Sequence, residues 1–485
     1  MYSYIYKNII TYRKKGLNLS DLEGLTRKLL QKGYSDDKII KRLIQEYIDF
    51  KEISEERAKF LAEAVLEECK KSDISSISDP FIKNLLSINN TDITIGDQGV
   101  GCRGAGDFFV HKMISEFSDA GIEAYLSPKS LDDAGAVRLK DFNLIKKIFK
   151  KQGENLIIVS KMEGIHSRLS DFPFICGFHV TRAALRDLYV KGAIPISILV
   201  DVHLGDDADV GKLFDFMSGI TAVCQLSKVP LTAGSTLRIG GDMVIGNRLT
   251  GGIGGVGIAG SNLFARRNIN PGDRILMTEG AGGGTISTTA IYSGNHEVVK
   301  ETMNIKFLEA CNIILNSEYK NGIHAMCDVT NGGLRGDLYE INYESNCGVT
   351  IYEEDIRKLV NTKVLDLLEN VGVDYLGVSL DALLIYCSKE VEEKIISDLT
   401  KNNINCVEIG YVDDSKEVEM VFEDNKSKKI LPKFRESAYT KIKKEIGEET
   451  PEKKEMMEKR IEEIASKALE KRKKLVEYIK NFNKN

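Results

Sequence analysis

The sequence predicts a mixed α+β fold of two domains, preceded by a helical extension and followed by a long charged helix. Its 485 residues suffice for about three units of roughly 150 residues, so a core can form without disulfides or structural metals. Of the 42 glycines, 37 lie between Gly96 and Gly377, where loops must turn tightly or approach a ligand. Short β-branched runs alternate with helical stretches in this region, which favours α/β or α+β domains over a sandwich or bundle.

Three consecutive helix signatures predict the N-terminal extension. The first helix begins at a capping box formed by Ser20 and Glu23 and ends at Gly33. The next two helices begin at Ser35 and Ser54. Leucine, isoleucine and valine recur at helical spacing in all three segments, which therefore form one small helical unit.

The strand-like runs after this unit are Leu156–Val159, Ile196–Val202, Met243–Ile258 and Arg274–Met277. The turn from Asn270 to Asp273 separates two such bodies, so we expect a domain boundary near residue 265. The expected units are a helical extension over 1–72, an N-terminal domain over 80–265, a C-terminal domain over 266–425 and a charged helix over 436–485.

The charged tail opens at Thr450-Pro451, a good N-cap and first-turn pair. A broken apolar stripe follows at helical spacing: Ile461, Ile464, Leu469, Leu475, Val476 and Ile479. We expect one long helix that packs on the body or on a partner chain.

Charge and composition exclude several classes of function. Lys plus Arg number 67 and Asp plus Glu 72, a net charge of −5, which argues against binding to nucleic acid or an anionic membrane. No apolar run reaches the roughly 18 residues of a membrane span, and the first residues lack a signal-peptide pattern, so we expect a cytoplasmic protein. The nine Cys form no CxxC pair and the six His no HExxH, which argues against zinc.

A glycine-rich segment, Asp97-Gln-Gly-Val-Gly-Cys-Arg-Gly-Ala-Gly-Asp107, runs into a helix-like stretch. The free N–H groups at such a helix start bind anions, and Arg103 could clamp the same phosphate. A flexible loop is the alternative interpretation. It is not a Walker A loop, because no GxxxxGK[ST] occurs in the chain.

Four aspartates, at three places in the chain, suit a metal or a phosphate. Asp132 and Asp133 precede a run of small residues and could hold Mg²⁺, although a solvated turn is the commoner interpretation of such a pair. Asp187 lies on a helix that ends at Gly192, and a surface aspartate is the alternative there. Asp328 ends a short strand just before a Gly-Gly turn, where a metal-bridged phosphate fits and a plain Asn-Gly turn is the alternative.

The segment Gly255-Val-Gly-Ile-Ala-Gly260 matches GxGxxG by letter only. It lies in a strand-like, glycine-rich run without the strand, turn and long helix of a dinucleotide site, so we interpret the match as chance.

The order of these motifs resembles the PurM-like aminoimidazole ribonucleotide synthase superfamily, over about residues 93–415. Selenophosphate synthetase, HypE and thiamine monophosphate kinase belong to it. The resemblance implies a dimerising N-terminal α+β domain, a C-terminal α+β domain, and ATP with Mg²⁺ between them. It also implies transfer of the γ-phosphoryl group to, or activation of, a small substrate or partner peptide.

The resemblance implies a set of site residues. The magnesium ligands would be Asp132, Asp133, Asp187, which matches the acid of an Asn/Ser-Asp pair, and Asp328. The nucleotide-binding residues would be Gly101, Cys102, Arg103, Gly104, Ala105, Gly106, Asp133, Gly234, Ser235, Thr236, Asn331 and Gly332. The catalytic candidates are Arg103, Asp107, Lys161 and Asp337.

Three departures from the family pattern qualify this expectation. Ser235 stands where the family usually has the acid of Gly-Gly-Asp-Thr, which weakens one metal position. The segment ending at His166 resembles Glu-Gly-Val-His but lacks the acid expected upstream. Val100 replaces the reactive Cys or selenocysteine of selenophosphate synthetase, which argues against that reaction, while Cys102 is either a thiolate beside Arg103 or structural.

The sequence therefore favours an ATP- and Mg²⁺-dependent phosphotransferase or synthetase that acts on a small molecule. The alternative is a nucleotide-binding regulatory or maturation protein whose turnover is lost or very slow. We expect a homodimer, and the terminal helices could dock a protein partner. The acceptor substrate is not indicated.

Overall fold

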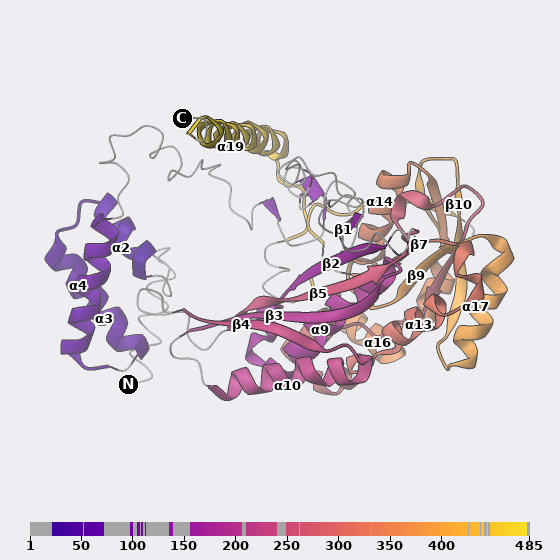
Figure 1. Cartoon of the computed structure of the whole chain (residues 1–485), viewed down its shortest axis with the longest axis horizontal. Helices are drawn as coiled ribbons and strands as arrows, with labels where there is room; N and C mark the ends of the chain where they lie inside the picture. The colour runs from indigo at the N-terminus through magenta and orange to yellow at the C-terminus, as the bar shows by residue number, and fades with distance from the viewer. Residues whose placement is uncertain are drawn as a thin grey trace.

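The computed structural model shows two mixed sheets with their helices, a separate helical unit and a long C-terminal helix (Figure 1). It describes residues 22–51, 53–71, 98–99, 104–106, 108–109, 112, 135–138, 156–205, 210–239, 249–260, 262–330, 332–424, 426–436, 438–440, 444 and 447–482. The predicted α+β class with its two helical additions is confirmed. Among the described residues, no helix combines the length and apolar character needed to cross a membrane.

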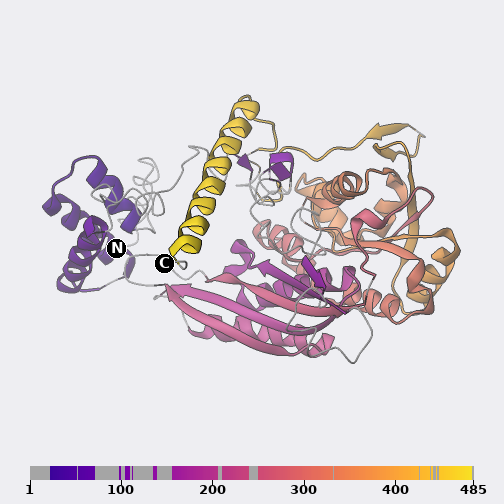
Figure 2. The same cartoon turned by 45° about the horizontal axis from the view of Figure 1, so that its top comes forward.

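The N-terminal helices form a small unit with its own core. They are α2 (Leu22–Gln31), α3 (Asp36–Lys51) and α4 (Glu55–Lys71). Leu22, Leu43 and Tyr47 are fully buried among them, as the helical spacing predicts. Both views show this unit apart from the two sheets (Figures 1 and 2).

The first sheet has the strand order β1-β2-β5-β3-β4. Its strands are β1 (Gly135–Arg138), β2 (Ile157–Gly164), β3 (Ile194–Gly205), β4 (Leu231–Ile239) and β5 (Leu249–Ala259). Only β3 and β4 pair in parallel among these contacts. Gly255 and Gly257 lie within β5, so the GxGxxG match is part of a strand and not a nucleotide loop, as expected.

Two helices cover one face of this sheet, α9 (Pro173–Val190) and α10 (Val210–Ser227). A Cβ atom on Gly177 would lie 2.2 Å from the carbonyl oxygen of Phe216, and one on Gly219 would lie 2.0 Å from that of Phe174. Glycine is therefore required at both positions, because the two helix backbones touch there.

The second sheet has the order β12-β11-β8-β10-β6-β9-β7. Its strands are β6 (Arg274–Thr278), β7 (Ile323–Asp328), β8 (Gly348–Tyr352), β9 (Leu383–Cys387), β10 (Cys406–Asp413), β11 (Val418–Val421) and β12 (Ser427–Lys429). Its helices are α11 (Gly284–Tyr292), α12 (Val299–Thr302), α13 (Lys306–Leu315), α14 (Gly333–Ser345), α15 (Glu353–Leu359), α16 (Thr362–Asn370) and α17 (Lys389–Lys401). Short 3₁₀ turns are η4 (Ser167–Asp171), η5 (Arg266–Asn268), η6 (His296–Val298), η7 (Glu318–Gly322) and η8 (Tyr375–Gly377).

One hydrophobic core joins the two sheets through α9. It contains Leu185 of α9 and Phe216 of α10 together with Phe307 of α13 and Ile385 of β9. Because these side chains are buried in a single cluster, the polar residues of α9 are held against the second sheet.

The C-terminal helix α19 (Lys454–Phe482) is continuous, as predicted, and begins three residues after Pro451. Ile464 is its buried apolar residue, whereas Met456, Val476, Tyr478 and Ile479 are exposed. The eight cysteines that the structure describes are all buried free thiols, which pack as small apolar residues.

Candidate functional site

Two strand ends of the second sheet place a pair of aspartates beside α9. Asp328 is the last residue of β7, and Asp381 lies just before β9. The N–H of Val329 donates to Ala382, and the N–H of Asp381 donates back to Val329 at 3.3 Å. Asp328 and Asp381 are 53 positions apart in the sequence, and this backbone pairing brings them to the same end of the neighbouring strands β7 and β9. Asp381 holds a left-handed backbone (φ 55°), which aspartate tolerates better than most residues.

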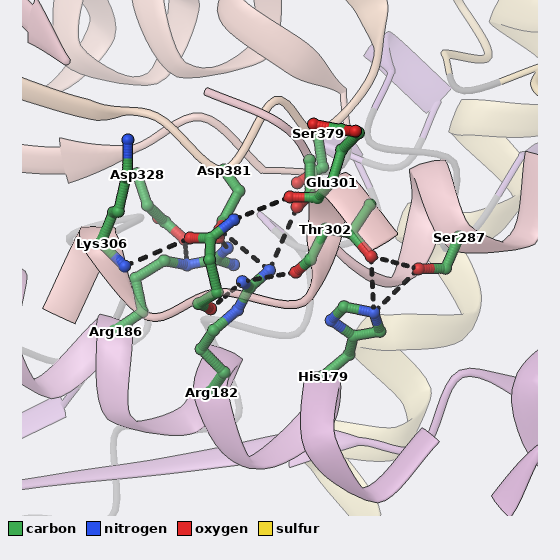
Figure 3. A network of polar contacts seen from close by, with 12 residues as sticks. His179, Arg182, Arg186, Ser287, Glu301, Thr302, Lys306, Asp328, Ser379 and Asp381 are labelled. Carbon is green, nitrogen blue, oxygen red and sulfur yellow. Dashed lines mark hydrogen bonds and ion pairs between the residues drawn. The ribbon is translucent and has the colours of Figure 1, made fainter. Parts of the chain in front are cut away.

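Two arginines of α9 meet these acids (Figure 3). Arg182 and Arg186 are four residues apart, so they project from the same side of the helix. Arg182 lies 2.9 Å from Asp381, and Arg186 lies 2.5 Å from the other oxygen of the same carboxylate. Arg186 also forms an ion pair with Asp328 through Nε. All four side chains are buried, so the domains are joined here by two cations and two anions.

The charges of this tetrad are fixed. Burial acts to lower the pKa of Arg186, but Asp328 and Asp381 together raise it above the usual value. Burial lowers the pKa of Arg182 against the opposing effect of Asp381. A guanidinium keeps its proton in proteins, so both arginines are cations at neutral pH.

A neutral histidine lies one turn before Arg182 on α9. His179 Nε2 is 2.8 Å from Ser287 Oγ and 3.3 Å from Thr302 Oγ1 (Figure 3). Burial, reinforced by Arg182, lowers the pKa of His179. The imidazole therefore joins α9 to α11 and α12 as an uncharged hydrogen-bonding group.

The loop between β6 and α11 is a feature that the sequence analysis missed. It reads Gly280-Ala-Gly-Gly-Gly284, and Arg182 donates to the carbonyl of Gly282 at 3.1 Å. The N-cap Gly283 gives α11 no side-chain cap. Such an N-terminus can receive an anion. A strand followed by a glycine run and a helix is the signal that identifies it, and β7–α14 has the same pattern with the uncapped N-cap Gly332.

Lys161 and Asp187, one a catalytic candidate and the other a predicted magnesium ligand, form an ion pair. Lys161 Nζ is 2.6 Å from Asp187 and 3.2 Å from Glu163. Asp187 is buried, so the alternative interpretation of a surface aspartate is wrong.

Asp337, another catalytic candidate, is held on α14 by its neighbours. Arg266 Nη2 lies 3.3 Å from Asp337 and 3.1 Å from Glu340. The N–H of Thr330 donates to Asp337 at 3.2 Å. This buried carboxylate therefore fixes the turn between β7 and α14.

The described part of the glycine loop contacts the C-terminal segment 431–440. The N–H of Ala105 donates to Lys433 at 2.8 Å, and that of Gly106 donates to Phe434 at 3.1 Å. A Cβ atom on Gly104 would lie 2.4 Å from the Lys433 carbonyl oxygen, so this close approach requires glycine.

The same segment reaches α14. Arg335 Nε lies 2.9 Å from the buried Glu436, and its Nη1 lies 2.7 Å from Asp374. Sequence analysis gave no sign of the contacts of Glu436 with Arg335 and of Lys433 with Ala105, because the partners lie a hundred or more residues apart in the chain.

The remaining predicted site residues are placed only in part. Gly234, Ser235 and Thr236 lie in β4, where their backbones pair with Val200–Val202 of β3. The other members of the predicted set lie outside the described residues: Gly101, Cys102, Arg103, Asp107, Asp132, Asp133 and Asn331.

The described acids do not fit a magnesium site. Mg²⁺ requires oxygen ligands at about 2.0–2.1 Å in octahedral geometry. Asp187 is paired with Lys161, and Asp328 with Arg186. In the part of the chain that the structure describes, no three His, Cys, Asp or Glu side chains gather where they could hold a metal.

Apart from β12, the strands of both sheets lie in regions that match models of one protein family. Residues 131–259 match the N-terminal domain of AIR synthase related proteins, and residues 270–423 match the C-terminal domain. An uncharacterized protein of Methanocaldococcus jannaschii is 44% identical over 470 residues, which is 96% of this chain and 100% of that protein.

More distant similarities agree with these matches. A selenide, water dikinase of Pelobacter propionicus is 25% identical over 228 residues, 46% of this chain and 59% of that protein. A chain in the crystal structure of a HypE-HypF complex has a TM-score of 0.52 at 18% identity, covering 66% of this chain and 99% of the other, which shows a shared fold.

Proposed function

The chain belongs to the AIR synthase related protein family, and from this premise we propose that it is an ATP-dependent phosphotransferase or synthetase acting on a small molecule. A relative of the chain is named as a dikinase, which supports phosphoryl transfer as the general chemistry.

The observation that carries the proposal is a pair of strand–glycine–helix units at the domain boundary. The N-terminal turns of α11 and α14 lack side-chain caps. Arg182 bonds the loop before α11, and Arg186 bonds the strand end before α14. The N-terminus of a helix carries a partial positive charge, and two such termini at one boundary favour a polyanionic ligand such as a nucleoside triphosphate.

Phosphoryl transfer depends mainly on positioning and on charge stabilisation. The two helix N-termini supply partial positive charge at this boundary, and the ion pairs of Arg182 and Arg186 with Asp381 and Asp328 hold the adjoining strand ends in place. A divalent cation, when bound, neutralises phosphate charge, and Asp132 and Asp133 are the predicted acids that remain for it.

A nucleotide-binding regulatory or maturation protein is the second candidate. It is favoured by the basic partners of Asp187 and Asp328, because acids paired in this way are poor metal ligands. Such a protein would bind ATP and return it unchanged.

The test is to titrate ATP into the purified protein, with and without Mg²⁺, and to identify the nucleotide by mass spectrometry after long incubation. If the wild type and the exposed control Glu390→Gln form ADP from ATP and Asp133→Asn does not, the result supports an ATP-dependent enzyme. ATP that binds and is recovered intact, also with candidate acceptors present, supports the regulatory protein. If the protein does not bind ATP, both proposed functions are wrong, and the similarity to the family is one of fold alone.

The proposal includes a homodimer formed through the first sheet. Met162, Ile194 and Leu199 are exposed on β2 and β3. A Cβ atom on Gly254 of β5 would contact Leu199 and Met162, so these two side chains share one face. An exposed apolar sheet face of this kind is typical of an interface. The exposed apolar residues of α19 offer a second surface for a protein partner.

A further inference from the structure

We infer that the guanidinium of Arg186 holds the place of a divalent cation beside Asp328, so that Asp328 binds no metal in this chain. This inference rests on the proposed function, because it concerns the site in which the nucleotide phosphates would lie. It replaces the expectation, taken from the family resemblance, that Asp328 is a magnesium ligand.

Geometry is the first argument. Arg186 forms ion pairs with Asp328 through Nε and with Asp381 through Nη1, the latter at 2.5 Å. One planar cation thus bridges two acids from neighbouring strand ends, as a metal ion does. The Asp328 side chain is fully buried, and Arg186 occupies the position beside its Oδ2 where a cation would bind.

Charge balance is the second argument. Arg182 and Arg186 carry two positive charges, and Asp328 and Asp381 carry two negative ones. The tetrad is therefore neutral, and a divalent cation added at Asp328 would leave this buried site with two uncompensated positive charges. Like charges repel strongly where little water screens them.

The third argument is that Arg186 cannot leave by losing its proton. A buried lysine or histidine can become neutral and give way to a metal, whereas a guanidinium keeps its charge. The guanidinium carbon of Arg186 also lies 5.6 Å from the ring centre of Phe307, a cation–π contact that favours the charged side chain in this place.

The sequence agrees with this arrangement. Asp187 matches the acid of an Asn/Ser-Asp pair, so Arg186 stands at the position of a neutral residue. A neutral side chain there would leave Asp328 without its guanidinium partner. The arginine instead compensates the charge of Asp328 at any metal concentration.

The experiment counts bound Mn²⁺ in the full-length protein by electron paramagnetic resonance, with and without a non-hydrolysable ATP analogue. Four variants are compared with the wild type: Arg186→Asn, Arg186→Lys, Asp328→Asn and the double variant Arg186→Asn/Asp328→Asn. Circular dichroism and thermal melting identify the folded variants, and only those are counted.

We expect equal Mn²⁺ counts in the wild type, Asp328→Asn and Arg186→Lys. Arg186→Asn should bind one more ion, and the double variant should lose that gain. The inference is overturned if Asp328→Asn alone lowers the count by one, or if folded Arg186→Asn gains no ion.

A second measurement needs no variant to fold. Fe²⁺ with ascorbate cleaves the backbone near bound metal, and mass spectrometry of the wild type locates the cuts. Cleavage around Asp328 and Asp381 contradicts the inference, and their protection supports it. The measurements without nucleotide test metal binding at Asp328 even if the ATP analogue does not bind. Failure of the proposed function would appear only as a lack of effect of the ATP analogue, so the two failures can be distinguished.

Discussion

Tyr439 forms a 2.6 Å hydrogen bond with His166, which lies 273 positions earlier in the chain. His166 follows β2 of the first sheet, and Tyr439 belongs to the segment 431–440 that follows the second sheet. Tyr439 is also buried in the core of the second sheet. This pair therefore links the segment after the second sheet to the end of β2 in the first sheet.

The Tyr439 hydroxyl is expected to stabilise this junction. Tyr439→Phe keeps the ring and removes the hydrogen bond to His166, at an expected cost of about 1 kcal/mol in unfolding free energy. Urea denaturation followed by circular dichroism measures the change. Tyr343→Phe, at an exposed tyrosine of α14, is the control, and an equal effect in both variants would contradict the prediction.

Glu436 is expected to contribute more to the unfolding free energy than the Tyr439 hydroxyl does, because Glu436 is buried and paired with a charged side chain. Glu436→Gln leaves Arg335 of α14 without a carboxylate that bonds it at two positions. Breaking such a pair costs about 3 kcal/mol. Glu417→Gln, in an exposed pair with Lys429, should cost less than about 1 kcal/mol. Similar urea midpoints for the two variants would show that the Arg335 contact is unimportant.

His324 makes stability depend on pH. Its hydrogen bond with Asp273 raises the pKa of His324 above 6.5, so the folded protein holds this proton more tightly than the unfolded chain. The contribution is complete below about pH 6.5 and is lost as pH rises through the raised value. Thermal melting between pH 5.5 and 8.5 should show this loss in the wild type and in the exposed control His296→Gln. A His324→Gln variant that keeps the same pH dependence would refute it.

The proposed homodimer predicts that charge on the exposed sheet face separates the subunits. Leu199→Asp and Met162→Glu place a carboxylate among apolar side chains, which is costly once water is excluded. Light scattering after size-exclusion chromatography should give a dimer for the wild type and a monomer for these variants. Leu431→Asp, at an exposed leucine outside this face, should stay dimeric. A monomeric wild type at micromolar concentration would contradict the proposal.

Much of the fold could be predicted because local patterns fix local elements. The capping residues and apolar spacing of residues 22–71 give three helices whatever lies around them. The strand ending at Asp328, the Gly-Gly turn and the following helix were also expected, and the left-handed backbones of Gly332 and Gly333 show why glycine is needed there. The loop before α11 has the same pattern of strand, glycine run and helix, but β6 ends at Thr278, whereas β7 ends at the acidic residue Asp328.

The sequence by itself determined the α+β class, the family resemblance and most helices and strands, since periodicity and turn residues act over a few neighbours. Tertiary structure alone decided the partners of the charged residues. Nothing near Asp187 in the sequence indicates Lys161, and nothing near Asp328 indicates Arg186. A carboxylate is the same chemical group whether it faces a metal or a guanidinium, and only the packing of α9 against the ends of the second sheet distinguishes the two.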